Sequence, residues 1–287
     1  MKKTIKFIFI TMLLFYFGKV KAVDNYNFLG LGDSVTSGFG ISDNKDYISI
    51  VNEYLKDNII NKTVILDNKA VNGLTSKGLL NTIKNNDNIK GQIKQSDLII
   101  LSIGGNDYLS ELITSIGSLE NEQKFVNIGN DLLMNTKDIY DNIFSLNKDV
   151  VLIVIPLYNP YVLLLQNNHN LIDIYNKTKE DFVNQVNEYR NNSNRNIYIP
   201  VNLIKELEST NNLNTGIDPH PNANGHKLIA EECIKILNDK IVRINNIEED
   251  NIEKDVNFIF KYRYYLIIVV VIIIAIIAKR RYNLKRK

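Results

Sequence analysis

The chain has 287 residues, 45% of them hydrophobic, which suits one sizeable core with appendages better than two independent domains. Its 34 basic and 32 acidic side chains nearly cancel, and a net charge of +2 provides no global field that would draw the chain to nucleic acid. The single cysteine, Cys233, excludes an intrachain disulfide and a cluster of thiolate metal ligands. We therefore expect one globular domain without a nucleic-acid partner.

The N-terminus has the three-part layout of a secretory signal peptide. Two lysines precede an apolar run at residues 7–17, and Val20-Lys21-Ala22 places small or medium side chains at the −3 and −1 positions of a cleavage site. An uncleaved signal anchor is the alternative, but a run of about 11 residues is well short of the ~20 that a spanning helix needs. We expect residues 1–22 to be removed after Ala22.

Five short apolar runs rich in β-branched residues predict buried parallel strands. These runs cover residues 26–31, 63–66, 98–103, 150–155 and 197–201. Stretches with helical spacing lie between and after them, at residues 47–60, 77–83, 108–146, 171–190 and from 223 to about 243. Because strands and helices alternate, with connections long enough to join parallel strands, we expect an α/β fold, a three-layer α/β/α sandwich around a five-stranded parallel sheet.

The C-terminal part predicts a membrane anchor. Residues 264–278 contain no charged or strongly polar side chain, and residues 258–262 lengthen this stretch toward the ~30 Å of a hydrocarbon core. The basic residues that follow place the C-terminus in the cytoplasm and the globular domain on the extracytoplasmic side of a cell membrane that is crossed once. A buried core helix is the alternative. From the N-terminus we expect a globular domain, a charged stalk, a transmembrane helix and a basic tail, at residues 23–243, 244–257, 258–278 and 279–287.

A serine follows the first predicted strand. In parallel sheets ligands bind beyond the carboxyl ends of the strands, and the sharp turn Gly32-Asp33-Ser34 would deliver Ser34 to that edge at the start of a helical turn. A serine there can be a nucleophile, activated by a nearby base. It can equally be a helix N-cap without any chemical role.

Two further turns follow predicted strands and would reach the same edge. After the second strand, Gly73 lacks a Cβ, so its backbone amide could face the cleft. After the third strand, Gly104-Gly105-Asn106-Asp107 offers the Asn106 side-chain amide to a developing oxyanion. Each stretch is also compatible with an ordinary glycine-containing turn.

One of the three histidines stands in a positioned loop. His220 lies between two prolines in the stretch Asp218-Pro219-His220-Pro221-Asn222, whereas His169 lies in a polar stretch and His226 on the expected last helix. With an unperturbed pKa of about 6.5, a histidine can take a proton from serine and pass it to a leaving group. A nearby carboxylate would orient its ring.

Together these blocks resemble the SGNH/GDSL hydrolase family of GDSL-like lipases and acylhydrolases, over roughly residues 25–238. Its four blocks are matched in order by Gly32-Asp33-Ser34, Gly73, Gly104-x-Asn106-Asp107 and His220-Pro221-Asn222. The resemblance implies a flavodoxin-like fold and a serine mechanism without metal or organic cofactor. It also implies Ser34 as nucleophile, His220 as base, and the Ser34 and Gly73 amides with the Asn106 side chain as oxyanion donors.

The position of the acid departs from the family pattern. The family usually has its acid three residues before the histidine, where this chain has Ile217, and Asp218 stands only two residues before it. Either Asp218 reaches the His220 ring through a shifted loop, or a backbone carbonyl orients the ring and the site works as a dyad.

The function that these residues favour is that of a serine esterase or lipase acting on a lipid, lysophospholipid or O-acetylated glycan ester. One alternative is an acyltransferase to surface glycans, and another is a catalytically inactive binding module tethered to the surface. An apolar segment at residues 158–165 is a candidate lining of an acyl pocket, or a helix packed on the core.

Two other classes fit the sequence less well. A metallophosphoesterase is suggested by a superficially ligand-like set, Asp33, Asn106, Asp107, His220 and His226, but an early Asp-x-His pair is absent. A nucleotide-binding protein would need the third glycine of a dinucleotide fingerprint after Gly30 and Gly32, or a phosphate-binding Gly-Lys-Ser/Thr loop, and the chain has neither.

Overall fold

The computed structural model of the chain describes residues 24–42, 44–115, 122–159, 169–209, 211–214 and 218–284. The expected signal peptide, residues 1–22, lies outside the described residues. The chain forms two compact units, the first containing residues 61–236 with the preceding residues up to Asp57, and the second containing Asn58–Ile60 and Leu237–Lys287.

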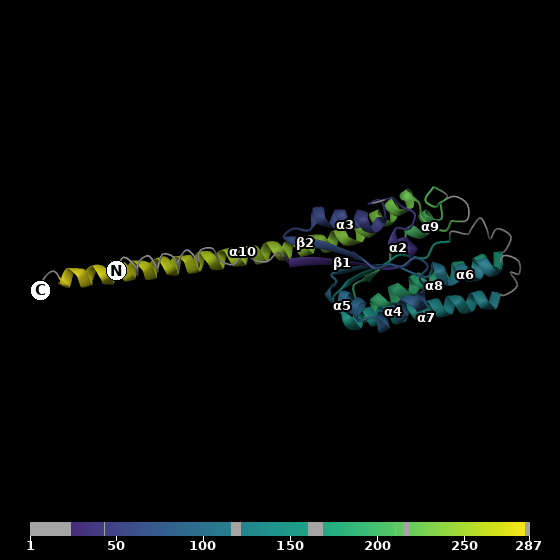
Figure 1. Cartoon of the computed structure of the whole chain (residues 1–287), viewed down its shortest axis with the longest axis horizontal. Coiled ribbons are helices and arrows are strands. Elements are labelled where there is room, and N and C mark those ends of the chain that lie inside the picture. Colours follow the sequence, from purple (N-terminus) through teal and green to yellow (C-terminus); the bar gives the residue numbers. More distant parts are fainter. Residues whose placement is uncertain are drawn as a thin grey trace. The chain divides into compact units, whose positions relative to one another are not determined.

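The first unit is built on a five-stranded parallel sheet in the order β2-β1-β3-β4-β5 (Figure 1). The strands are β1 (Asp24–Gly32), β2 (Lys62–Asn68), β3 (Leu98–Ser102), β4 (Val151–Val154) and β5 (Ile197–Tyr198). All five predicted strands are present, and the predicted α/β class is confirmed. The central strand β3 is buried along its whole length, as expected for a strand covered on both faces.

Helices cover both faces of the sheet (Figure 1). Their bounds are α2 (Ser34–Ser37), α3 (Tyr47–Asn58), α4 (Ser76–Asn85), α5 (Asp87–Gln95), α6 (Gly105–Ser115), α7 (Glu122–Leu146), α8 (His169–Ser193), α9 (Leu203–Leu207) and α10 (Ala223–Leu284). Helices α4, α5, α7 and α8 lie on one face, and α3 and the beginning of α10 on the other (Figure 1). Apolar side chains of α4, α5, α7 and α8 pack with sheet residues in one hydrophobic core.

The helices differ from the sequence prediction in several places, and the short helix α9 was not predicted. Residues 108–146 were expected to form one helix, but two are present, α6 and α7, joined by residues 116–121 outside the described part. Helix α5 was not predicted, because its polar sequence contains Gly91 and only two buried apolar residues. His169, expected in a polar loop, is the first residue of α8.

The last helix was expected to end near residue 243, but α10 continues without a break to Leu284. No glycine or proline occurs after Gly225 that would interrupt it. In the second unit, the side chain of Asn245 accepts a hydrogen bond from the Ile60 amide at 3.1 Å and donates one to the Asn58 carbonyl at 2.8 Å.

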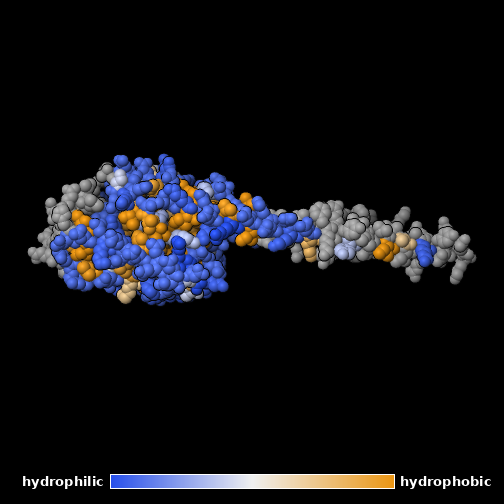
Figure 2. Space-filling model, turned by 180° about the vertical axis from the view of Figure 1, so that it is seen from behind, coloured by the Kyte–Doolittle hydropathy of each residue, from blue (hydrophilic) through white to orange (hydrophobic). Residues whose placement is uncertain are grey.

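Among the helices of the described residues, none combines the length and the apolar character needed to cross a membrane. Most side chains of the predicted span at residues 258–278 lie outside the described part, and the span stays a prediction. The surface of the first unit is mostly hydrophilic on the face shown in Figure 2, with hydrophobic side chains gathered in patches.

Candidate active site

A tight turn at the end of β1 positions Ser34. Gly32 has φ +119°, and a Cβ there would lie 1.8 Å from the Ser102 carbonyl oxygen, so only glycine fits. The Asp33 amide donates to that same carbonyl at 2.9 Å, which ties the turn to the neighbouring strand β3. The Asp33 carboxylate then caps α2 by accepting a hydrogen bond from the Val35 amide at 3.1 Å. Ser34 therefore begins a helical turn at the carboxyl edge of the sheet, as expected.

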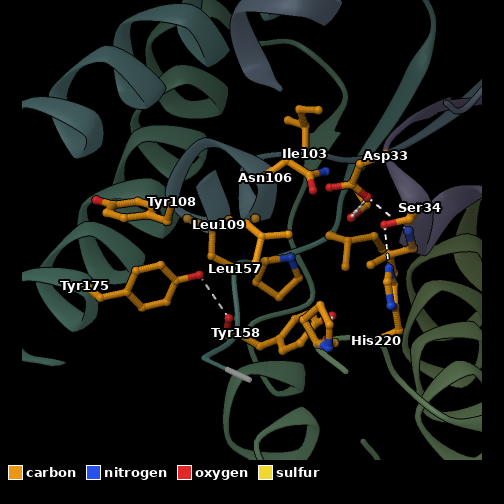
Figure 3. A pocket seen from close by; sticks show the side chains of 16 residues that line it. Asp33, Ser34, Ile103, Asn106, Tyr108, Leu109, Leu157, Tyr158, Tyr175 and His220 are labelled. Atoms are coloured by element: carbon orange, nitrogen blue, oxygen red, sulfur yellow. Dashed lines mark hydrogen bonds between the residues drawn. The ribbon is translucent and has the colours of Figure 1, made fainter. Parts of the chain in front are cut away.

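The loop before α10 brings His220 to this serine, 186 positions away in the sequence. Its Nε2 lies 2.8 Å from Ser34 Oγ, and its Nδ1 lies 2.6 Å from Asp218 Oδ1 (Figure 3 shows the first contact). With the Nδ1 proton shared with the carboxylate, Nε2 is left to accept the serine proton. The Phe39 ring packs on the imidazole with the two ring centroids 5.0 Å apart.

Asp218 reaches the histidine although it precedes it by only two residues. Its Oδ1 also accepts the His220 backbone amide at 3.0 Å, and its Oδ2 accepts the Asn214 side chain at 3.0 Å. Burial by itself would raise the pKa of the Asp218 carboxyl. The hydrogen bonds from His220 and Asn214, together with the charge of His220, have the larger effect, so the pKa is lowered. Of the two arrangements that the sequence left open, the geometry is that of an aspartate facing the ring.

The two other predicted residues, Gly73 and Asn106, line one groove at the carboxyl edge. Gly73 has φ +76°, which a side chain would disfavour. Asn106 also lines the cavity beside Ser34, and its Nδ2 donates one hydrogen bond to the Leu74 carbonyl at 3.1 Å, leaving its second N–H available. Within the described residues, neither the Ser34 nor the Gly73 backbone amide donates a hydrogen bond. Three N–H groups are thus available for an oxyanion.

A cavity of about 50 Å³ opens beside the serine. In Figure 3, Ser34 and His220 lie at one end, and Tyr108 and Tyr175 lie at the other. The wall between them is largely apolar and includes Val35, Ile103, Leu109, Ile155, Pro156, Leu157 and Tyr158. Tyr158, from the segment predicted as a possible acyl-pocket lining, does line the cavity, and residues 160–168 lie outside the described part.

Several hydrogen bonds around the site were not predicted from the sequence. The Tyr158 hydroxyl donates to the Pro219 carbonyl at 2.8 Å, and the Tyr175 hydroxyl donates to the Tyr158 carbonyl at 3.0 Å, so the cavity wall is bonded to the histidine loop. Ser102, the last residue of β3, donates through Oγ to Asp33 Oδ1 at 3.1 Å. In the sequence, only the position of Ser102 before the Gly104 turn suggested a role near the site. The hydrogen bonds of the tyrosines could not be foreseen, because tyrosines in apolar stretches resemble ordinary core residues.

Asp33 is an unusual carboxyl group next to the nucleophile. Asp33 is 3% exposed, and burial raises its pKa to about 7. The hydrogen bonds from Val35 and Ser102 favour the ionised form and oppose this rise, but burial has the larger effect. The charge of Asp33 is repelled by that of Asp107, which adds a smaller rise. Asp33 therefore titrates near neutral pH beside the serine.

His226 lies on α10, as expected, and is fully buried. Its Nδ1 accepts the Tyr47 backbone amide at 3.2 Å, and its ring stacks on that of Tyr47. Among the described residues, no group of three or more His, Cys, Asp or Glu side chains is arranged to hold a metal ion. Two members of the ligand-like set thus have other partners, since His226 packs with Tyr47 and His220 faces Ser34.

A parallel α/β/α sandwich with a serine after the first strand and a histidine loop before the last helix defines the class of SGNH/GDSL hydrolases. Residues 28–233 match the model of the GDSL-like Lipase/Acylhydrolase family, and the chain belongs to that family. It is 27% identical over 222 residues to YpmR, an uncharacterized protein of Bacillus subtilis (strain 168), covering 76% of this chain and 84% of that protein.

Solved structures share the fold at low sequence identity. The lipase Lip_vut3 from a goat rumen metagenome has a TM-score of 0.61 at 20% identity, over 74% of this chain and 97% of that one. An extracellular lipase from Streptomyces rimosus has a TM-score of 0.53 at 15% identity, over 75% and 99% of the two chains. An acetyl-xylooligosaccharide esterase from Geobacillus Stearmophilus has a TM-score of 0.52 at 14% identity, over 76% and 96%.

Proposed function

We propose that this protein is a serine esterase that hydrolyses carboxylic esters through an acyl-enzyme. The observation that carries the proposal is the continuous contact from Asp218 through His220 to Ser34, with 2.6 Å and 2.8 Å between the paired atoms. Membership of a family of lipases and acylhydrolases supports the same reaction class.

In this mechanism His220 Nε2 takes the proton of Ser34 Oγ while that oxygen attacks the ester carbonyl carbon. The carbonyl oxygen becomes an oxyanion that accepts hydrogen bonds from the Ser34 and Gly73 amides and the Asn106 side chain. The imidazolium, held by Asp218, then donates its proton to the leaving alcohol oxygen as the C–O bond breaks. Water, deprotonated by His220, then attacks the acyl carbon. The bond from that carbon to Ser34 Oγ breaks, the carboxylic acid leaves, and the proton held by His220 restores the Ser34 hydroxyl.

The substrate that we propose is an ester with an apolar acyl part. The cavity beside Ser34 is lined mainly by apolar side chains, and its lining includes the buried rings of Tyr108 and Tyr175. A volume of about 50 Å³ suits a short chain better than a long one. Lipid, lysophospholipid and O-acetylated glycan esters all contain an acyl group beside a polar alcohol, and the size of the cavity favours the short acetyl group of the glycan esters.

We also propose that the hydrolase domain works outside the cytoplasm, tethered to the cell membrane. The support is the signal-like layout of residues 1–22 and the apolar stretch at residues 258–278, with basic residues after it. Protease added to intact cells should digest the domain and spare a C-terminal tag. Protection of the domain in that assay would refute this topology.

The activity test compares the full-length chain with Ser34→Ala and His220→Ala on p-nitrophenyl acetate, butyrate and octanoate. Each change should reduce kcat/KM by roughly 10⁴-fold or more, because the nucleophile or its base is removed. Ser145→Ala, an exposed serine on α7, is the matched control and should keep full activity. Failure of the native protein to hydrolyse any ester or to react with a fluorophosphonate would overturn the esterase proposal in favour of a binding module.

A further inference from the structure

The three proposed oxyanion donors come from separate segments of the chain. Gly73 lies in the connection between β2 and α4, and Asn106 lies in the first turn of α6. Within the described residues, no backbone hydrogen bond joins the Gly73 turn to the start of α6. The Gly73 turn is bonded to β1 through the Val71 amide and the Gly32 carbonyl at 2.8 Å, so any direct link from this turn to α6 is made by side chains.

Asp107, the neighbour of Asn106, bridges the two segments. Its Oδ2 accepts the Ser76 backbone amide at 2.9 Å, and its Oδ1 accepts the Ser76 hydroxyl at 2.5 Å. Asn135 of α7 donates to the same hydroxyl through Nδ2 at 3.0 Å. Both carboxylate oxygens are therefore used to bind one residue, and that residue lies three positions after Gly73.

The chemistry at this contact favours a carboxylate over any neutral side chain. Ser76 is the first residue of α4, so its N–H has no partner within the helix and lies at the positive end of the helix dipole. Ser76 is fully buried, and an unpaired N–H there would be costly. Burial raises the pKa of the Asp107 carboxyl, while the two Ser76 hydrogen bonds oppose the rise and favour the ionised form.

We infer that Asp107 is a positioning residue that holds the Gly73 amide and the Asn106 amide at the spacing an oxyanion requires. Asp107 acts on one side through Ser76, and its neighbour Asn106 completes the link by donating to the Leu74 carbonyl at 3.1 Å. Donors stabilise an oxyanion only within about 2.7–3.1 Å, so a displacement of the Gly73 turn costs rate even though Asp107 does not touch the substrate. This inference rests on the proposed esterase function.

The main test is Asp107→Asn, measured on p-nitrophenyl butyrate with the full-length protein. An Asn amide has one oxygen and can accept only one of the two Ser76 hydrogen bonds, while the Ser76 hydroxyl would have to turn to accept from the NH₂, so the charge-assisted contact through two acceptor oxygens is weakened. We expect kcat to fall about 10- to 100-fold, within the cost of losing one oxyanion donor, with KM changed less than twofold. The affinity for a trifluoromethyl ketone, which forms a tetrahedral oxyanion adduct with serine, should fall by the same factor.

Matched variants separate positioning from general damage. Asp57→Asn removes an exposed carboxylate on α3 that makes no hydrogen bond or ion pair within the described residues and does not line the groove, and it should leave kcat unchanged. Ser76→Ala should reduce kcat in the same way as Asp107→Asn. The double variant should be no slower than the worse single one, because both changes break one contact.

Amide hydrogen exchange provides a readout that needs no activity. In Asp107→Asn, the peptide covering residues 71–76 should exchange at least tenfold faster, with other peptides and the melting behaviour close to those of the native protein. A kcat within twofold of native, additive effects in the double variant, or unchanged exchange at residues 71–76 would each overturn the inference.

If the native protein is inactive, the esterase proposal fails and the exchange result alone decides the role of Asp107. If Asp107→Asn does not fold, kcat and amide hydrogen exchange are both measured on Ser76→Ala instead.

Discussion

Replacing His226 with phenylalanine should change how the stability of the first unit depends on pH. Burial lowers the pKa of His226 to about 4, with a smaller downward contribution from His220 that the charge of Asp46 opposes. Its Nδ1 accepts the Tyr47 amide and its buried Nε2 has no hydrogen-bond partner in the described part, so in a doubly protonated ring neither N–H would have an acceptor there. His226→Phe keeps a ring for stacking on Tyr47 and removes the titration.

The direction and size of the pH effect on stability follow from the pKa of His226 in the unfolded chain and in the fold. In the unfolded chain the histidine binds a proton below about 6.5, whereas in the fold it stays neutral down to about 4. Stability from this group is therefore present above pH 6.5 and is lost as the pH falls to about 4. At about 1.36 kcal/mol per pKa unit, the full loss is roughly 3 kcal/mol, most of it, about 2 kcal/mol, between pH 7 and pH 4.5.

The assay is urea unfolding of the native and His226→Phe proteins at pH 7 and pH 4.5. A difference between variants is needed because Asp33, whose pKa is raised to about 7, contributes stability that is lost as the pH rises, opposite to the histidine. The native protein should lose about 2 kcal/mol more than His226→Phe on acidification. Equal losses within about 0.5 kcal/mol would show that His226 is not held neutral and would refute the reasoning.

Three further changes test the site. Asp218→Asn should reduce kcat about 10²-fold, less than for a fully buried triad acid because its side chain is 42% exposed; a loss under threefold in ester hydrolysis would indicate a dyad instead. Tyr158→Phe removes the hydrogen bond to Pro219 and should lower kcat roughly fivefold with little change in KM, and an unchanged kcat would show that this bond does not position the histidine loop. Gly32→Ala should destabilise the protein by about 3 kcal/mol or more in thermal or urea unfolding, because its Cβ would overlap the Ser102 carbonyl, and native-like unfolding would contradict the geometry of the turn.

Local patterns in the sequence were sufficient for the sheet and for the main chemical groups. Strand β3 is a run of apolar residues because it is buried on both faces, so its position could be read directly. The glycines around Ser34 and the prolines around His220 mark turns that have few permitted conformations, and both residues do lie at the carboxyl edge. Helices with weak apolar patterns were harder, as α5 shows.

Local sequence patterns could not predict contacts between residues that are distant in the sequence. Whether Asp218 reaches the imidazole depends on the conformation of a loop bonded to Asn214 and Tyr158, and one residue of spacing could not settle it. Local composition, periodicity and turn chemistry thus specified the α/β sandwich and nominated the serine and histidine, because these properties depend on near neighbours. Packing of the helices on the sheet selected the partners that orient them, because a hydrogen bond such as that from Ser76 to Asp107 exists only once separate segments meet.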